Sequence, residues 1–249
     1  MLPTLALLLA LGSATPVMGA VTDSTTAAAD TSASLPRSPD TWSDTAASRH
    51  SLLSRKDVWF AAGTVGAVVL ATKLDRWAAE EAPENSGGTA VHLSHGAEHL
   101  GNPLYVLPGI LFVHAANALE HRSDRAGSLM RVVEGAGAAV AATSIVKLAV
   151  GRARPYQTPG DQDVMRPFSG YTAFPSGHTA FAFGLATAID QETKARWVPY
   201  VVYPLAAMVG WSRLRDNKHW LSDVVAGASI GTWTARKVVK LARRAIRTN

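Results

Sequence analysis

The sequence predicts an all-α protein, a bundle of six helices in one domain. Two observations support this class. Of the 249 residues, 47% are hydrophobic and only 17% are charged, against about 25% charged in an average soluble domain. The apolar residues also fall into long runs rich in alanine and glycine, which suggests closely packed helices. A chain of this length can bury the core of one sizeable domain.

Six apolar runs alternate with short polar connections from Asp57 onward. None of the runs alternates polar and apolar residues with period two, and alanine dominates them, so helix is favoured over strand. Polar breakers containing Pro83, Ser123 or Pro155 separate the runs. In chain order the predicted helices are Val58–Thr72, Leu104–Leu119, Val132–Val150, Ala173–Ile189, Val198–Trp211 and Leu221–Ala235.

The N-terminal part of the chain has a different composition. Residues 1–20 contain an apolar stretch from Leu5 to Leu11 followed by small residues, which predicts a secretory signal peptide, although no Lys or Arg precedes it. An uncleaved anchor helix is the alternative. Residues 21–56 are rich in Ser, Thr, Ala, Asp and Pro without hydrophobic periodicity, which predicts a flexible linker. The predicted domain is then 57–236, and residues 237–249 form a basic tail.

Whether the predicted helices cross a membrane is not decided by their pattern. The runs are about 14–19 residues long, at or below the ~20 residues that a spanning helix needs. If they all span, the distribution of Lys and Arg places the linker in the cytoplasm, whereas a cleaved signal peptide places it outside. The conflict disappears if the domain does not span, so the sequence favours an exported bundle, periplasmic or at the membrane surface.

Composition also limits the chemistry. The absence of cysteine excludes a disulfide scaffold, a thiol enzyme, a zinc–thiolate site and an iron–sulfur centre. A net charge of +5 suggests an anionic partner such as phosphate or lipid. Nucleic acid is not expected, because the basic residues stand at helix ends beside apolar runs, without interleaved aromatic residues.

Three clusters carry the chemistry, and the first is Lys147-Leu-Ala-Val-Gly-Arg152-Ala-Arg154-Pro155. It lies at the end of an apolar run that Pro155 terminates. An arginine fork matches phosphate oxygens in pairs, and a lysine adds a point charge. The cluster therefore suggests a phosphate site, with a solvated helix end or a membrane-flanking anchor as the alternative.

The second cluster is Phe174-Pro-Ser176-Gly177-His178. Ser176 is a good N-cap, and Gly177 allows a ligand to approach the backbone. The start of a helix favours an anion through its free N–H groups and its dipole. His178 would stand there as a proton donor or acceptor, although an ordinary capped helix with an incidental histidine would look the same.

The third cluster runs from Ser212-Arg213 to His219-Trp-Leu-Ser-Asp223. His219 and Asp223 are four residues apart and would share one face of a helix. A carboxylate bound to one imidazole nitrogen fixes the tautomer and leaves the other nitrogen free to attack. Arg213 adds a guanidinium. The alternative is a surface His–Asp pair.

The order and spacing of the three clusters, over residues 147–223, resemble the type 2 phosphatidic acid phosphatase (PAP2) and vanadium haloperoxidase superfamily. Every signature position is present, and the helical pattern extends the resemblance over about 57–236. The resemblance implies an all-α bundle of that type. It also implies a metal-independent phosphatase that hydrolyses a phosphomonoester or diphosphate, with a lipid phosphate favoured, and that needs no cofactor.

The resemblance also implies roles for single residues. His219 would be the nucleophile that forms a phosphohistidine, Asp223 would orient it, and His178 would be the general acid. The phosphoryl oxygens would be bound by Lys147, Arg154, Ser176, Gly177 and Arg213. Arg152 lies inside the first motif but is not one of its fixed positions, so it receives no role.

Other functions stay open. His95 and His99 are four residues apart and would allow a pair of metal ligands, although no metal is expected. Soluble phosphate esters are the alternative substrate class. Haloperoxidase activity with vanadate and a lipid-binding membrane protein with an inactive pocket are less favoured.

Overall fold

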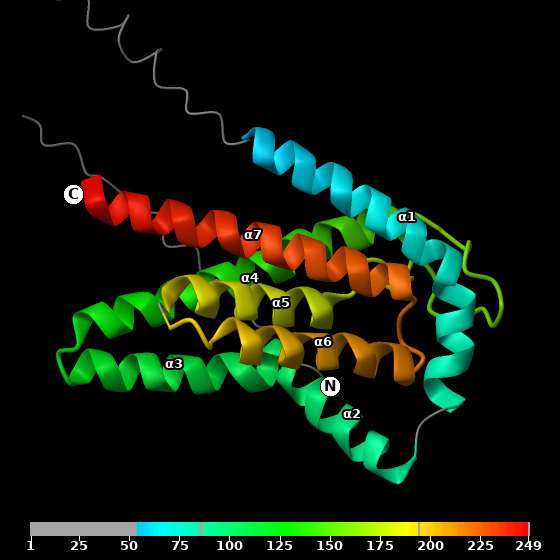
Figure 1. Ribbon diagram of the computed structural model, residues 1–249, viewed down its shortest axis with the longest axis horizontal. Coiled ribbons are helices and arrows are strands. Elements are labelled where there is room, and N and C mark those ends of the chain that lie inside the picture. The colour runs from blue at the N-terminus through cyan, green and yellow to red at the C-terminus, as the bar shows by residue number, and fades with distance from the viewer. Residues whose placement is uncertain (1–53, 85–86, 194, 249) are drawn as a thin grey trace, which may run out of the picture. The chain divides into compact units, whose positions relative to one another are not determined.

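The computed structural model describes residues 54–84, 87–193 and 195–248. Over these ranges the long regular elements are all α-helices, so the predicted all-α class is confirmed (Figure 1). The helices are α1 (Arg55–Glu84), α2 (Gly88–Leu100), α3 (Pro103–Leu119), α4 (Ser123–Val150), α5 (Gly177–Glu192), α6 (Pro199–Arg215) and α7 (Leu221–Thr248). The predicted signal peptide and nearly all of the predicted linker lie outside the described residues.

Each of the six predicted runs lies in a helix, but the described part of the chain contains a seventh, α2. Its sequence mixes Thr, Ser, Gly and three histidines among the apolar residues, which weakened the helical pattern there. Several boundaries also differ from the prediction, and α1 and α4 begin before the predicted runs Val58–Thr72 and Val132–Val150. α5 begins at Gly177 rather than Ala173, because Ser176 caps it. α7 extends to Thr248 and includes most of the basic tail.

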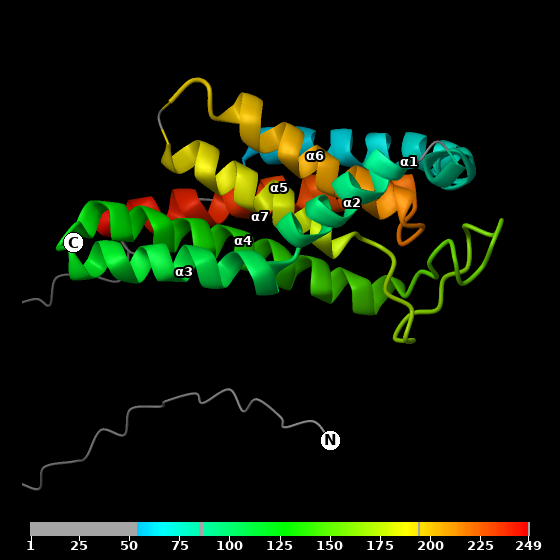
Figure 2. The ribbon, with the colours of Figure 1, turned by 90° about the horizontal axis from the view of Figure 1, so that it is seen from below.

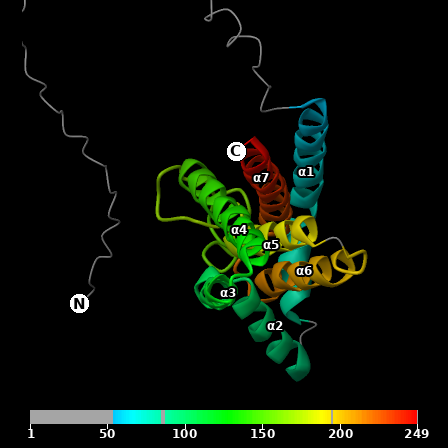
Figure 3. The same ribbon diagram turned by 90° about the vertical axis from the view of Figure 1, so that its left-hand side faces the viewer.

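The core of the bundle is formed by α4, α5 and α7, and α5 lies near its centre (Figures 2 and 3). α1 packs along α7, α3 packs along α4, and α2 packs on α6. The buried core residues are small. One cluster joins α4, α5 and α7, another joins α5 and α6, and their buried members are Val132, Ala188, Ala235, Val239, Ala182, Ala186, Ala206 and Val209.

Glycines allow α5 and α7 to approach at backbone distance. A Cβ added at Gly231 of α7 would overlap the carbonyl group of Ala180 in α5, and one added at Gly227 would overlap the carbonyl oxygen of Ser176. Protein interiors are packed densely enough that such an overlap requires the helices to move apart. The closeness of the two helices is therefore set by residues that lack a side chain.

The outer faces of the bundle carry many large apolar side chains. Leu104 and Phe112 on α3 are 81% and 76% exposed, and Trp59 on α1 is 75% exposed. Exposed apolar surface on this scale indicates an interaction surface. α1 and α4 are also long and apolar enough to cross a membrane. The shortness of the predicted runs argued against membrane-spanning helices. In the structure, α1 and α4 are longer than the runs predicted for them.

We expect Gly231→Ala to destabilise the protein by about 1–3 kcal/mol, because the new methyl group forces α7 away from α5. The measurement is the free energy of unfolding in detergent solution. Gly137→Ala is the matched control, since a Cβ at this position of α4 meets nothing within 4 Å. Equal stability of the two variants would show that the α5–α7 approach is not constrained at Gly231.

Candidate active site

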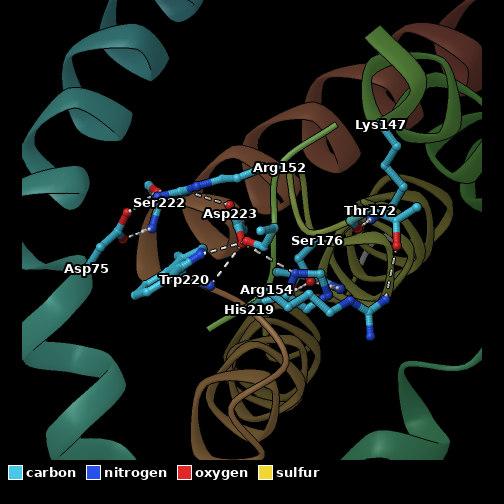
Figure 4. Close-up of polar contacts among 12 residues, drawn as sticks. Asp75, Lys147, Arg152, Arg154, Thr172, Ser176, His219, Trp220, Ser222 and Asp223 are labelled. Carbon is cyan, nitrogen blue, oxygen red and sulfur yellow. Dashed lines mark hydrogen bonds and ion pairs between the residues drawn. The ribbon is translucent and has the colours of Figure 1, made fainter. Parts of the chain in front are cut away.

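The predicted site residues come from the ends of four helices. They lie at the C-terminal ends of α4 and α6, at the starts of α5 and α7, in the turn before α7, and in the loop that joins α4 to α5. One backbone hydrogen bond joins two of these ends, because the N–H of Ser176 donates to the carbonyl oxygen of Asp223 at 2.9 Å. Segments far apart in the sequence thus meet in one small region (Figure 4).

The first cluster is held at the end of α4. Gly151 ends this helix in the left-handed conformation, with φ of 58°, and its N–H donates to the carbonyl oxygen of Lys147. The Lys147 Nζ donates to the carbonyl oxygen of Thr172 at 2.6 Å, and Arg154 donates to the Thr172 hydroxyl at 3.3 Å (Figure 4). Thr172 therefore brings the two cations together, a role that no sequence pattern indicated.

The second cluster forms the start of α5. Ser176 is fully buried, and its hydroxyl accepts hydrogen bonds from the N–H and the hydroxyl of Thr179 at 3.5 and 2.9 Å. This is the predicted N-cap. A Cβ added at the next residue, Gly177, would lie 3.5 Å from Lys147 Cε, so the helix start faces the first cluster. Burial, with help from Arg213, lowers the pKa of His178 to about 4.

Arg213 lies in the last turn of α6 and is only 3% exposed. Its guanidinium pairs with Glu98 of α2 at 3.1 Å and with Asp216 at 3.2 Å. The hydrogen bond from Arg213 lowers the pKa of Glu98, so this carboxylate stays charged. The side chain of Glu98 is 41% exposed, which leaves it room to withdraw. An anion that binds Arg213 would compete with Glu98.

His219 and Asp223 do not share a helix face as predicted. His219 lies in the turn before α7, and its backbone N–H donates to the carbonyl oxygen of Arg213. Of the two residues, only Asp223 lies within a helix. The turn forms because the Asp223 Oδ2 accepts the N–H of Trp220 at 2.9 Å. This oxygen is 3.5 Å from His219 Nδ1, which is longer than an ordinary hydrogen bond. Catalytic hydrogen bonds are often this long before substrate binds.

The environment of His219 favours its neutral form. Burial lowers the pKa of the imidazole, and the nearby cations Lys147 and Arg154 lower it further, while Asp223 opposes them. A neutral imidazole has a free nitrogen lone pair. The region thus combines three cationic side chains, a helix start and a buried imidazole whose pKa is lowered, which together can hold an anion beside a nucleophile.

Arg152 is the residue whose place the sequence did not predict. It is 1% exposed, and its Nη1 donates to the Asp223 Oδ1 at 2.7 Å. It therefore contacts the carboxylate rather than the region where the other cations gather.

The histidines of α2 are not arranged as a set of metal ligands. Among the described residues, no three His, Asp or Glu side chains are grouped closely enough to hold a metal ion, and His99 packs edge-on against Tyr105.

Comparisons with a family model and with curated proteins identify relatives of this chain. The model of the PAP2 superfamily matches residues 128–247. A lipid A 1-phosphatase of Porphyromonas gingivalis is 44% identical over 61 residues, which are 24% of this chain and 14% of that protein. Lipid phosphate phosphatase 1 of Arabidopsis thaliana is 38% identical over 79 residues, 26% of this chain and 24% of the relative. The chain thus spans less than a quarter of the length of these two curated relatives.

Two solved structures have a similar fold. A transmembrane PAP2-type phosphatidylglycerolphosphate phosphatase from Bacillus subtilis aligns with a TM-score of 0.58 and 19% identity, over 77% of this chain and 96% of the other. Aquifex aeolicus LpxE aligns with a TM-score of 0.50 and 18% identity, over 67% of this chain and 95% of the other. The two likenesses show a shared fold. The three motifs lie within residues 128–247, which the family model matches, and on this match the chain belongs to the PAP2 superfamily.

Proposed function

We propose that this protein is a PAP2-type phosphatase that hydrolyses a phosphomonoester or diphosphate of a lipid through a phosphohistidine intermediate. The observation that carries the proposal is the buried imidazole of His219, 3.5 Å from the Asp223 carboxylate. Its burial and the nearby cations Lys147 and Arg154 lower its pKa. Phosphoryl transfer requires positioning and charge stabilisation rather than covalent help from many groups. This combination of residues is suited to both.

In the first step, the phosphoryl group lies among Lys147, Arg154 and Arg213, where their charges stabilise its equatorial oxygens. The His219 Nε2 attacks the phosphorus, and the bond from phosphorus to the leaving oxygen breaks. His178, which takes up a proton when the anion binds, gives that proton to the leaving oxygen, so the alcohol leaves neutral. Asp223 holds the N–H of His219 and stabilises the positive charge that develops on the imidazole.

In the second step, water replaces the alcohol. His178, now neutral, accepts a proton from the water, whose oxygen attacks the phosphorus. The bond between phosphorus and His219 breaks, and phosphate is released. Splitting hydrolysis into two transfers lowers the barrier of each. The carboxylate of Glu98 leaves Arg213 when the anion enters, because both compete for one guanidinium.

Three observations favour a lipid substrate over a soluble ester. The names of the relatives include lipid A 1-phosphatase and lipid phosphate phosphatase. The outer faces of α1 and α3 expose large apolar side chains. An apolar groove of about 430 Å³ between α1, α4 and α7 reaches Val146, the residue before Lys147, and suits an acyl chain. We therefore also propose that the protein works at a membrane of the cell envelope.

The direct test is an assay of the purified full chain in detergent micelles with EDTA present. We expect it to release phosphate from phosphatidic acid, with an aryl phosphate as the soluble comparison. His219→Ala should lower kcat by ~10³-fold or more while the fold and the binding of inorganic phosphate persist. Turnover of the aryl phosphate alone would favour the soluble-ester alternative. No turnover of either substrate by folded protein would contradict the phosphatase proposal.

We expect His178→Asn to slow poor leaving groups more than good ones. An alkyl phosphate needs the proton to leave and should lose about 10²–10⁴-fold in kcat/KM, whereas an aryl phosphate with an acidic phenol should lose much less. The measurement is a series of esters whose leaving groups differ in pKa. An equal loss across the series would remove the general-acid role from His178.

Anion binding should be linked to proton uptake by His178. In the free protein its pKa is about 4, so the ring is mostly neutral at pH 6. A bound dianion raises this pKa, and affinity then increases as the pH falls, by up to about tenfold per pH unit. Calorimetry with sulfate, which stays a dianion from pH 5 to 7, measures this slope. His178→Asn should flatten it, and an unchanged slope would assign the proton to another group.

A further inference from the structure

A buried network of charges joins α1 to the carboxylate that faces His219. Arg152 lies between two carboxylates, and its Nη2 donates to the Asp75 Oδ2 at 2.8 Å while its Nη1 donates to the Asp223 Oδ1 at 2.7 Å (Figure 4). Both carboxylates are fully buried, and Arg152 is 1% exposed. Asp75 comes from α1, which lies outside the residues that the family model matches.

The network leaves Arg152 no free donor. A guanidinium has five N–H groups. The remaining three donate to the Ser222 hydroxyl at 2.7 Å and, from Nε and Nη2, to the carbonyl oxygen of Gln162 at 3.0 and 2.8 Å. The guanidinium also lies 5.4 Å from the centre of the Trp220 ring. Arg152 therefore cannot turn toward a phosphate without breaking several buried bonds, each of which is costly to lose.

Asp75 fixes the other side of the network. Its Oδ1 accepts the N–H of Ser222 at 2.7 Å, and its Oδ2 accepts the Ser222 hydroxyl at 2.6 Å. Asp75 thus binds both Arg152 and the residue next to Asp223. Asp223 is in turn held from two directions, by Arg152 at Oδ1 and by the N–H of Trp220 at Oδ2. Oδ2 lies 3.5 Å from His219 Nδ1.

We propose that Asp75 and Arg152 are positioning residues that hold the Asp223 carboxylate toward His219, so that α1 contributes to the active site without touching the substrate. The inference rests on the proposed function. A fully satisfied buried network fixes one arrangement of its members. If the network is broken, Asp223 can rotate, and His219 loses the partner that orients it. Phosphate binding is spared, because Lys147, Arg154 and Arg213 lie outside the network.

The test is a double-mutant cycle on kcat, measured per folded molecule in micelles with a phosphate ester that the wild-type protein hydrolyses. Asp75→Asn keeps the size of the side chain and removes its charge. We expect kcat to fall about tenfold or more and KM to change less than about twofold. In the Asp223→Asn background the same change should cost less than about twofold, because the orientation is already lost.

Two further variants make the result decisive. Glu80→Gln removes an exposed carboxylate from the same helix and should leave kcat unchanged. Ser222→Ala is the milder alternative if Asp75→Asn does not fold, because it removes a hydroxyl shared by Arg152 and Asp75 while all charges remain. It should also lower kcat in the wild-type background and not in the Asp223→Asn background.

Different failures have different meanings. A loss of thermal stability with unchanged kcat would make Asp75 a structural ion partner only and overturn the inference. An equal loss of kcat in both backgrounds would show that the effect does not pass through Asp223, and would also overturn it. Absence of turnover in the wild-type protein with every substrate would instead contradict the proposed function.

Discussion

The approach of α5 to α7 is the constraint on which the rest of the structure depends. Gly227 and Gly231 place one helix backbone against the carbonyl groups of the other, and the start of α5 is thereby tied to the start of α7 through Ser176 and Asp223. A helix start carries unpaired N–H groups and the positive end of the dipole. Bringing two helix starts and two helix ends together creates a polar region beside core clusters that consist of small apolar side chains.

The two buried arginines are paired in different ways, and the difference matters for function. Arg213 pairs with the mostly buried Asp216 and with Glu98, whose side chain is 41% exposed. Arg152 pairs only with carboxylates that are fully buried. Breaking a buried ion pair leaves an uncompensated charge and costs several times more than breaking a partly exposed one. Arg213 can therefore exchange its carboxylate for an incoming anion, and Arg152 cannot.

The apolar character of the outer helices complements this polar interior. The exposed side chains of α1 and α3 have no protein partner large enough to cover them among the described helices. Hydrocarbon would solvate such faces without cost, whereas water would not. α1 then serves two purposes, since its outer face is apolar while Asp75 on its inner face joins the network behind Asp223.

Local sequence was enough to predict the helical class and the family. Alanine-rich runs have helical propensity wherever they lie, and the spacing of Lys147, Arg154, His178, Arg213 and His219 identifies a family without coordinates. It was not enough for α2, whose polar composition hides a helix that packs on α6, or for the turn that removes His219 from α7. Asp75 and Glu98 were likewise invisible as partners, because their significance depends on Arg152 and Arg213, which are distant in sequence. Residue type and spacing determined the helical class and the family. Tertiary packing alone decided which buried charges face one another, since the free energy of a buried charge depends on its neighbours in space and not on its neighbours in the chain.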